Sequence, residues 1–210
     1  SAESRAPVAS RHSPGASSVV PLHRRVWFMT ERDKGPRIRK VPTGDNRQRL
    51  VCPDCEYVAY ENPKVVVGVV ATWEDKLLMC KRAIEPRRGF WTLPAGFMEL
   101  GETPEEGASR EAWEEACATL EIIDLLAVYS LRHISQLQLF YRARLISPDV
   151  SAGIESEEVG LFSFDDLPAT DLAFPSVYWA IDHFQRVRGA ESFVPFRNPP
   201  GHGGEMNRGR

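Results

Sequence analysis

Three glutamates in one short segment are the residues of this chain best suited to chemistry. Glu111, Glu114 and Glu115 are spaced i, i+3 and i+4, so in a helix their carboxylates share one face. Like charges placed this way weaken a bare helix by about 0.2–0.5 kcal/mol per pair. A divalent cation turns that repulsion into binding, because hard cations prefer clustered carboxylate oxygens. The spacing therefore indicates a site for Mg²⁺ or Mn²⁺, with a solvated acidic face as the alternative.

The helix that must position these glutamates has a clear start in the sequence. Thr103 can cap it, Pro104 fits the first helical position, and Glu106 completes a Thr-x-x-Glu capping box. We therefore expect a helix from about Pro104 to Cys117. A solvated acidic face explains this helix, but it does not explain the other residues found at fixed offsets from the glutamates.

Those residues and their spacing resemble the Nudix box. In this chain the matching residues are Gly96, Glu102, Arg110-Glu111 and Glu114-Glu115. One departure lies at Cys117, where the family has a glycine after the paired glutamates. The resemblance implies an α+β fold, the Nudix α/β/α sandwich with a mixed sheet, in which the box forms a loop, a helix and a loop.

The resemblance also implies a role for each residue of the box. The implied metal ligands for Mg²⁺ or Mn²⁺ are Glu111, Glu114, Glu115 and the backbone carbonyl of Gly96. Arg110 and Glu102 would brace the box through a charged hydrogen bond rather than react. Bound metal neutralises the pyrophosphate and lowers the pKa of water, so that hydroxide can attack phosphorus in line.

The proton of that water needs an acceptor. In the Nudix family this base is either a glutamate of the box or an acid outside it. Glu155 and Glu158 follow the strand that ends near Ile146, and they are the candidates for the second option. The alternative is that each is only an acid in a surface loop.

Segments around the box resemble the Nudix proteins of plants and bacteria classed as FAD and ADP-ribose pyrophosphatases. The matching segments are Asn62-Pro-Lys, Trp91-Thr-Leu-Pro-Ala-Gly and Leu172-Ala-Phe174. The resemblance implies hydrolysis of a nucleoside diphosphate derivative, first FAD to FMN and AMP, then ADP-ribose. Lys81, Arg82, Arg87 and Arg88 are basic residues that could steer the diphosphate, and Arg82 is the predicted ligand among them. Trp91 and Phe174 could stack on the rings of the substrate. A solvated basic loop and core aromatic residues are the alternatives.

Two other functions stay open. NADH pyrophosphatases also pair a zinc ribbon with this box, although the Ser-Gln-Pro-Trp-Pro-Phe-Pro-like segment that they carry after the box is absent here. A non-catalytic Nudix-fold module would bind nucleotides or partners without turnover. Loss of box glutamates would favour that module, whereas all of them are present in this chain.

A Cys-x-x-Cys pair precedes the box. Cys52-Pro-Asp-Cys55 resembles the second half of a zinc ribbon, whose first half should hold another such pair near residues 28–35, where this chain has no cysteine. Structural zinc normally takes four ligands, so we expect a degenerate ribbon without zinc. Cys80 and Cys117 are interpreted as buried small residues. So few cysteines, without a disulfide pattern, predict a reducing compartment.

Bulk properties limit the partners. The chain has 210 residues and a net charge of -3, so no basic field favours DNA or RNA. No apolar run approaches the roughly 20 residues that span a bilayer. We therefore expect a soluble protein with a small-molecule nucleotide as its partner, no nucleic acid and no membrane. Homodimers are common in the family, so a homodimer is an open expectation.

Composition divides the chain into four expected regions. They are residues 1–25, a disordered or transit-peptide-like extension; 26–60, the degenerate ribbon; 61–195, the Nudix domain; and 196–210, a flexible tail. The Ser- and Arg-rich start predicts either a plain extension or an organelle transit peptide, hence the cytoplasm or a plastid. Strands are expected at 65–71, 76–82, 121–134, 136–146 and 160–164, an extended segment at 90–97, and a second helix at 176–188.

Overall fold

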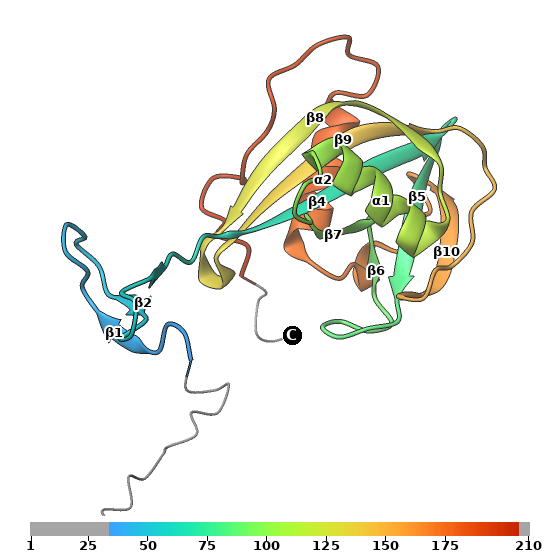
Figure 1. The fold of residues 1–210 in the computed structure, drawn as a ribbon. Helices are drawn as coiled ribbons and strands as arrows, with labels where there is room; N and C mark the ends of the chain where they lie inside the picture. Colours follow the sequence, from blue (N-terminus) through green and yellow to red (C-terminus); the bar gives the residue numbers. More distant parts are fainter. Residues whose placement is uncertain (1–33, 206–210) are drawn as a thin grey trace, which may run out of the picture. The chain divides into compact units, whose positions relative to one another are not determined.

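The computed structural model describes residues 34–205, and the chain divides into two compact units, Ser1–Tyr60 and Glu61–Arg210 (Figure 1). The described part of the first unit is a small antiparallel sheet of three short strands. These are β1 (Ile38–Lys40), β2 (Arg49–Val51) and β3 (Val58–Ala59), in the order β1-β2-β3. Cys52 and Cys55 lie in the turn between β2 and β3, which is the expected place of the ribbon's second half.

The second unit is built on a mixed sheet with the strand order β10-β5-β4-β9-β8, in which β6 pairs with β5 and β7 with β4. Its strands are β4 (Lys64–Trp73), β5 (Lys76–Arg82), β6 (Trp91–Thr92), β7 (Ala95–Phe97), β8 (Leu120–Leu131), β9 (Gln136–Leu145) and β10 (Ser156–Ser163). The β4–β9 pair is parallel, and the other pairs are antiparallel. The expected mixed sheet is therefore confirmed.

Two helices cover the two faces of this sheet, α1 (Pro104–Ala116) and α2 (Pro175–Arg186) (Figure 1). Successive side chains of a strand point to opposite faces, and β4 shows the result. Val69 belongs to the apolar cluster that contains Ala108 and Ala112 of α1, whereas Val70 belongs to the cluster that contains Ala180 of α2. The α/β/α sandwich follows from this alternation.

The observed elements differ from the expected ones where polar residues or proline intervene. The extended segment 90–97 breaks at Pro94, which has no N–H to donate, so β6 and β7 pair with different strands. The strand expected to run to residue 134 ends at Leu131, and Arg132–Ile134 form a 3₁₀ turn into β9. β10 begins at Ser156 rather than residue 160, because its polar first residues still pair with β5 across a bulge.

The C-terminal segment lies along β8, the outermost strand of the sheet. Phe196 donates its N–H to the Leu126 carbonyl and accepts from the Val128 N–H, both at 2.9 Å. The Asn198 side chain accepts from the N–H of Ser130 at 2.8 Å and donates to its carbonyl at 3.0 Å. The tail that the sequence predicts to be flexible thus begins with residues that cover a sheet edge. Neither helix in the described part of the chain is long and apolar enough to cross a membrane.

Candidate active site

The start of α1 holds the loop and helix of the box in register. Thr103 Oγ1 accepts from the Glu106 N–H at 3.2 Å, and Glu106 Oε2 accepts from the Thr103 N–H at 2.8 Å. The predicted capping box is therefore confirmed, with Pro104 in the first turn. At the other end Cys117 caps the helix in the left-handed conformation, with φ 50°. A glycine adopts this conformation at little cost, which accounts for the glycine that the family pattern places here.

Two of the three glutamates are buried where α1 meets β7. The exposed fractions of Glu111 and Glu115 are 9% and 6%, whereas the Glu114 side chain is 55% exposed. The Ala95 N–H donates to Glu115 Oε2 at 3.2 Å. A Cβ atom placed on Gly96 would lie 2.3 Å from the Glu111 carboxylate. Gly96 is thus the residue that lets this acid approach the backbone of β7.

Burial and mutual repulsion disfavour the charged forms of these two acids. The pKa of the Glu115 carboxyl is raised to about 8, first by burial and then by the charges of Glu111 and Glu155, against the hydrogen bond from Ala95 and the charge of Arg82. The pKa of Glu111 is also raised, first by burial and then by Glu114 and Glu155, although Arg110 opposes this. A hard divalent cation binds carboxylates in their ionised form and would offset the repulsion between them. The chemistry of these side chains, rather than their present arrangement, suits Mg²⁺ or Mn²⁺.

Arg110 organises the acids around it. Its Nε and Nη2 donate to the Glu102 carboxylate at 3.0 and 2.8 Å, and its Nη1 donates to Glu111 at 2.8 Å and Glu114 at 2.9 Å. Its Nη2 also donates to the carbonyl of Phe97 at 3.0 Å. These hydrogen bonds lower the pKa of Glu102 to about 2 and raise that of Arg110. Within residues 34–205 no three acid, histidine or cysteine side chains yet converge as metal ligands, and Arg110 holds Glu111 and Glu114 instead.

The loop after β9 is attached to the end of α1. Ser151 and Gly153 donate their N–H groups to the carbonyls of Ala116 and Glu115, both at 3.0 Å. This attachment brings Glu155 close enough for its charge to raise the pKa of both buried glutamates. Glu158 instead forms an ion pair with Lys81 at 3.6 Å. Of the two predicted acids outside the box, Glu155 therefore lies within electrostatic range of the buried glutamates, whereas Glu158 is paired with Lys81.

Comparisons with known proteins agree with this geometry. A family model described as NUDIX domain matches residues 62–181, and a second, described as Nudix N-terminal, matches residues 34–61. The chain belongs to the Nudix family. The expectations of a Nudix fold and of a Nudix hydrolase are therefore confirmed, whereas the roles of individual residues stay predictions.

Three Nudix relatives illustrate the similarity. The chain is 32% identical to an ADP-ribose pyrophosphatase of Methanocaldococcus jannaschii, over 54% of this chain and 69% of that protein. It is 29% identical to the NAD-capped RNA hydrolase NudC of Chromobacterium violaceum, over 67% of this chain but only 54% of that protein. The crystal structure of a Nudix hydrolase from Nitrosomonas europaea superposes with a TM-score of 0.72 at 47% identity, covering 77% of this chain and 93% of that one. The chain spans about half the length of several curated relatives.

The three predicted substrate-binding residues of this Nudix chain occupy different surroundings. Arg82 lies over the ring of Phe174 at 5.2 Å, and its charge lowers the pKa of Glu115. Trp91 is only 8% exposed and packs edge-on against Phe162 at 4.9 Å. The structure therefore brings Arg82 and Phe174 into contact with each other, whereas it places Trp91 in the core, with its backbone carbonyl accepting from Ala173 at 2.7 Å.

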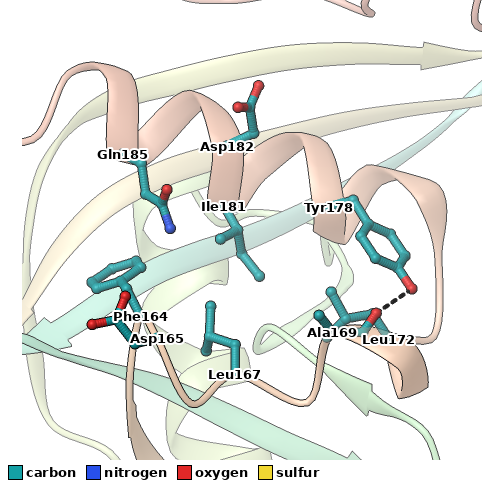
Figure 2. Close-up of a pocket in the computed structure, with 9 residues that line it drawn as sticks. All are labelled: Phe164, Asp165, Leu167, Ala169, Leu172, Tyr178, Ile181, Asp182 and Gln185. Carbon is teal, nitrogen blue, oxygen red and sulfur yellow. Dashed lines mark hydrogen bonds between the residues drawn. The ribbon is translucent and has the colours of Figure 1, made fainter.

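A pocket of about 270 Å³ lies elsewhere in the Nudix unit, between α2 and the segment 164–172 (Figure 2). Its lining residues are Phe164, Asp165, Leu167, Ala169, Leu172, Tyr178, Ile181, Asp182 and Gln185. None of the predicted site residues lines it. The buried acids on α1, and not this hollow, therefore mark the candidate active site.

The cysteine pair of the first unit has no further metal ligand among residues 34–205. The Cys52 thiol lies 3.7 Å from Asp54 Oδ2, and backbone N–H groups of Asp54 and Cys55 lower the pKa of that thiol. Asp54 itself pairs with Arg37 at 2.9 Å. Between residues 34 and 205 no third cysteine, histidine or acid joins the pair as a metal ligand. Two thiols do not fit a metal that takes four ligands.

Proposed function

We propose that this Nudix hydrolase uses Mg²⁺ or Mn²⁺ to cleave the pyrophosphate bond of a dinucleotide-like nucleoside diphosphate derivative, FAD or ADP-ribose. The observation that carries the proposal is the pair of buried acids, Glu111 and Glu115, set against the Gly96 backbone with Arg110 beside them. The choice of substrate is supported by two things. The segments around the box resemble FAD and ADP-ribose pyrophosphatases, and one relative is an ADP-ribose pyrophosphatase.

Each side chain has a distinct task in the proposed reaction. Glu111, Glu114, Glu115 and the Gly96 carbonyl would hold the cation, which when bound offsets the phosphate charge and acidifies water. Arg110 orients Glu111 and Glu114 through its two Nη1 hydrogen bonds. The oxygen of one water bonds to phosphorus, the bridging P–O bond breaks, and the departing phosphate takes the electron pair. AMP and either FMN or ribose 5-phosphate are the products.

Glu155 is the proposed proton acceptor. It is exposed, so it can reach water, and its charge acts on both buried glutamates. Glu158 serves as the matched control, because it is an exposed acid of the same segment that is paired with Lys81. Glu155→Gln is expected to lower kcat by about 100-fold, within the range for lost general-base catalysis, while Glu158→Gln leaves it nearly unchanged. An equal effect of the two variants would remove Glu155 from this role.

The decisive test of the activity is a substrate panel. The purified chain is assayed with FAD, ADP-ribose, NADH, CoA and nucleoside triphosphates in Mg²⁺ or Mn²⁺, and the products of each reaction, AMP for the first three substrates, are separated and measured. Glu115→Gln should abolish turnover, whereas Glu105→Gln, an exposed acid at the start of the same helix, should not. Unchanged turnover in Glu115→Gln would overturn the assignment of the metal site.

A second substrate class has one observation in its favour. The relative from Chromobacterium violaceum is an NAD-capped RNA hydrolase, and it matches 67% of this chain. NADH and NAD-capped RNA contain the same kind of pyrophosphate bond as FAD and ADP-ribose. Preferred turnover of NADH in the panel would shift the substrate to this class and leave the proposed chemistry intact.

A further inference from the structure

Four basic residues lie at the end of β5 and in the loop between β5 and β6, and their ion pairs divide them into two kinds. Lys81 pairs with Glu158 at 3.6 Å, and Arg88 pairs with Glu157 at 2.8 Å. Arg82 and Arg87 form no ion pair with any described residue. The positive charges of these two arginines are therefore the ones available to an anion.

Both available arginines are held in place by the main chain and by an aromatic ring. Arg82 Nε donates to the Pro86 carbonyl at 2.9 Å, and its guanidinium lies 5.2 Å from the centre of the Phe174 ring. Arg87 Nε donates to the Ala173 carbonyl at 3.1 Å, with its guanidinium 3.8 Å from the centre of the Phe90 ring. In each case only Nε is used, so the terminal amino groups keep their donors for a ligand.

The two arginines meet at one segment. Arg87 bonds to the backbone of Ala173, and Arg82 stacks on the side chain of the next residue, Phe174. The end of β5 that carries Arg82 is joined to the loop at the end of α1, because the Ala83 N–H donates to the Glu155 carbonyl at 2.8 Å and the Gly153 N–H donates to the Glu115 carbonyl at 3.0 Å. A diphosphate attacked at the acids can therefore extend toward these two arginines.

The backbone of the loop holds Arg87 in an uncommon conformation. Its φ is 68°, in the left-handed region that non-glycine residues rarely adopt. Hydrogen bonds close the loop around it, from the Arg82 N–H to the Phe90 carbonyl at 2.9 Å and from the Gly89 N–H to the Arg82 carbonyl at 2.8 Å. Strain of this kind persists where surrounding structure fixes it, and it gathers at ligand clamps.

We propose that Arg82 and Arg87 form a two-arginine clamp for the phosphate oxygens of the substrate, in which Arg87 is a further substrate-binding residue. This clamp rests on the proposed pyrophosphatase function. It would bind the phosphate group of the substrate that lies farther from α1, the helix with the proposed metal ligands. A guanidinium suits this task because its planar donors match phosphate oxygens in pairs. Lys81 and Arg88 lie outside the clamp, because acids of β10 already neutralise them.

The test compares Arg87→Ala with Arg88→Ala in the full chain, since Arg88 is the neighbouring arginine with a partner. KM and kcat are measured for ADP-ribose and FAD, and binding of inorganic pyrophosphate is measured by calorimetry. Arg87→Ala should raise KM and weaken pyrophosphate binding by about 10- to 100-fold, the range for charged hydrogen bonds. Arg88→Ala should change both by less than about twofold. Equal effects, or none in Arg87→Ala, would overturn the clamp.

A second variant distinguishes loss of the clamp from loss of positive charge and from misfolding. Arg87→Lys keeps the charge but loses the planar donors and the bond to Ala173, so most of the binding loss should remain; full recovery would contradict the clamp. If the wild type hydrolyses ADP-ribose or FAD and Arg87→Ala behaves like it, the clamp fails and the proposed function stands. If no dinucleotide is hydrolysed but Arg87→Ala still loses pyrophosphate binding, the function fails and the clamp stands.

Discussion

Arg110 binds the Glu102 carboxylate with two parallel hydrogen bonds, from Nε to Oε2 at 3.0 Å and from Nη2 to Oε1 at 2.8 Å. The same guanidinium reaches Glu111 and Glu114 through Nη1. A loop acid and two helix acids are thus tied to one planar group. Because only a guanidinium offers such a fork of donors, this arrangement depends on arginine and not on positive charge alone.

Arg110→Lys therefore tests the arrangement. Lysine keeps the charge but cannot donate in parallel to Glu102 while holding both helix glutamates. We expect kcat/KM for the best substrate to fall by at least about tenfold, the equivalent of one charged hydrogen bond. Arg186→Lys is the control, because Arg186 forms an exposed i,i+4 pair with Asp182 on α2. Similar losses in both variants would contradict a special role for the fork.

The raised pKa of Glu115 predicts how the metal-free protein responds to pH. Its pKa is about 8 in the folded protein against an ordinary value of 4.5. The folded state therefore binds the carboxyl proton of Glu115 more tightly than the unfolded state does. The stability that this proton contributes is fully present below pH 4.5 and is lost as the pH rises through 8. As the pH rises, the free energy of unfolding should therefore fall by roughly 2–4 kcal/mol less in Glu115→Gln than in the wild type.

Urea unfolding in EDTA, at several pH values between about 4.5 and 9, measures this slope in both proteins. Groups that do not interact with Glu115 contribute equally to each, so the difference between the two slopes reports Glu115 together with its coupling to Glu111 and Glu155. Mg²⁺ should flatten the decline in the wild type, since a cation favours the ionised acid. Equal slopes in the two proteins without metal would contradict the raised pKa of Glu115 in the folded protein.

Gly153 predicts a second sensitive position. A Cβ atom there would lie 1.7 Å from the Glu114 carbonyl oxygen, so Gly153→Ala must push the loop off the end of α1. We expect a loss of roughly 1–3 kcal/mol in unfolding free energy, together with lower kcat because Glu155 moves with the loop. Ser151→Ala is the control, since only the backbone N–H of Ser151 bonds to α1. Wild-type kcat in Gly153→Ala would show that the attachment does not position Glu155.

Cys117 predicts a gain in stability. Its φ of 50° is left-handed, and glycine relieves that strain while costing more entropy on folding. Cys117→Gly should raise the unfolding free energy by about 0.5–1 kcal/mol in urea titrations. Cys117→Ala removes the same thiol but keeps the strained backbone, so it should give no gain. If both variants are stabilised alike, the thiol rather than the backbone is responsible.

The ribbon-like unit predicts a protein that folds without structural zinc. Purified from zinc-supplemented cells, it should hold well below one zinc per chain by elemental analysis. Changing Cys52 and Cys55 to serine together should leave the unfolding temperature nearly unchanged, because no four-ligand site is lost. One zinc per chain that disappears in the double variant would show that ligands beyond the described residues complete the site.

The elements of the fold could be predicted because their signals are local. The Thr103 cap, the proline after it and the spacing of the glutamates act within one helix, and their helix starts where predicted. The apolar run of β4 likewise needs only its own residues to be recognised. The alternating pattern of β9 gave its limits to within a residue.

The finer arrangement of the site could not be predicted because it depends on residues far apart in the chain. Nothing near Glu155 or Glu158 in the sequence tells which one acts on the acids of α1; the contacts of Gly153 with the end of that helix decide it. Trp91 lies in a segment typical of the family, yet its ring is buried against Phe162 of β10. Gly153 itself has no signal in a single sequence, since its need for glycine comes from the Glu114 carbonyl.

One short hydrogen bond joins the two halves of the candidate site. The Ala83 N–H, next to Arg82, donates to the carbonyl of Glu155 at 2.8 Å. The loop that carries the available arginines and the segment of the proposed proton acceptor are therefore expected to move together. Substitutions that reshape the loop for a new nucleotide would also shift that acid. Substrate preference and turnover rate in this lineage are thus expected to evolve together, as a single trait.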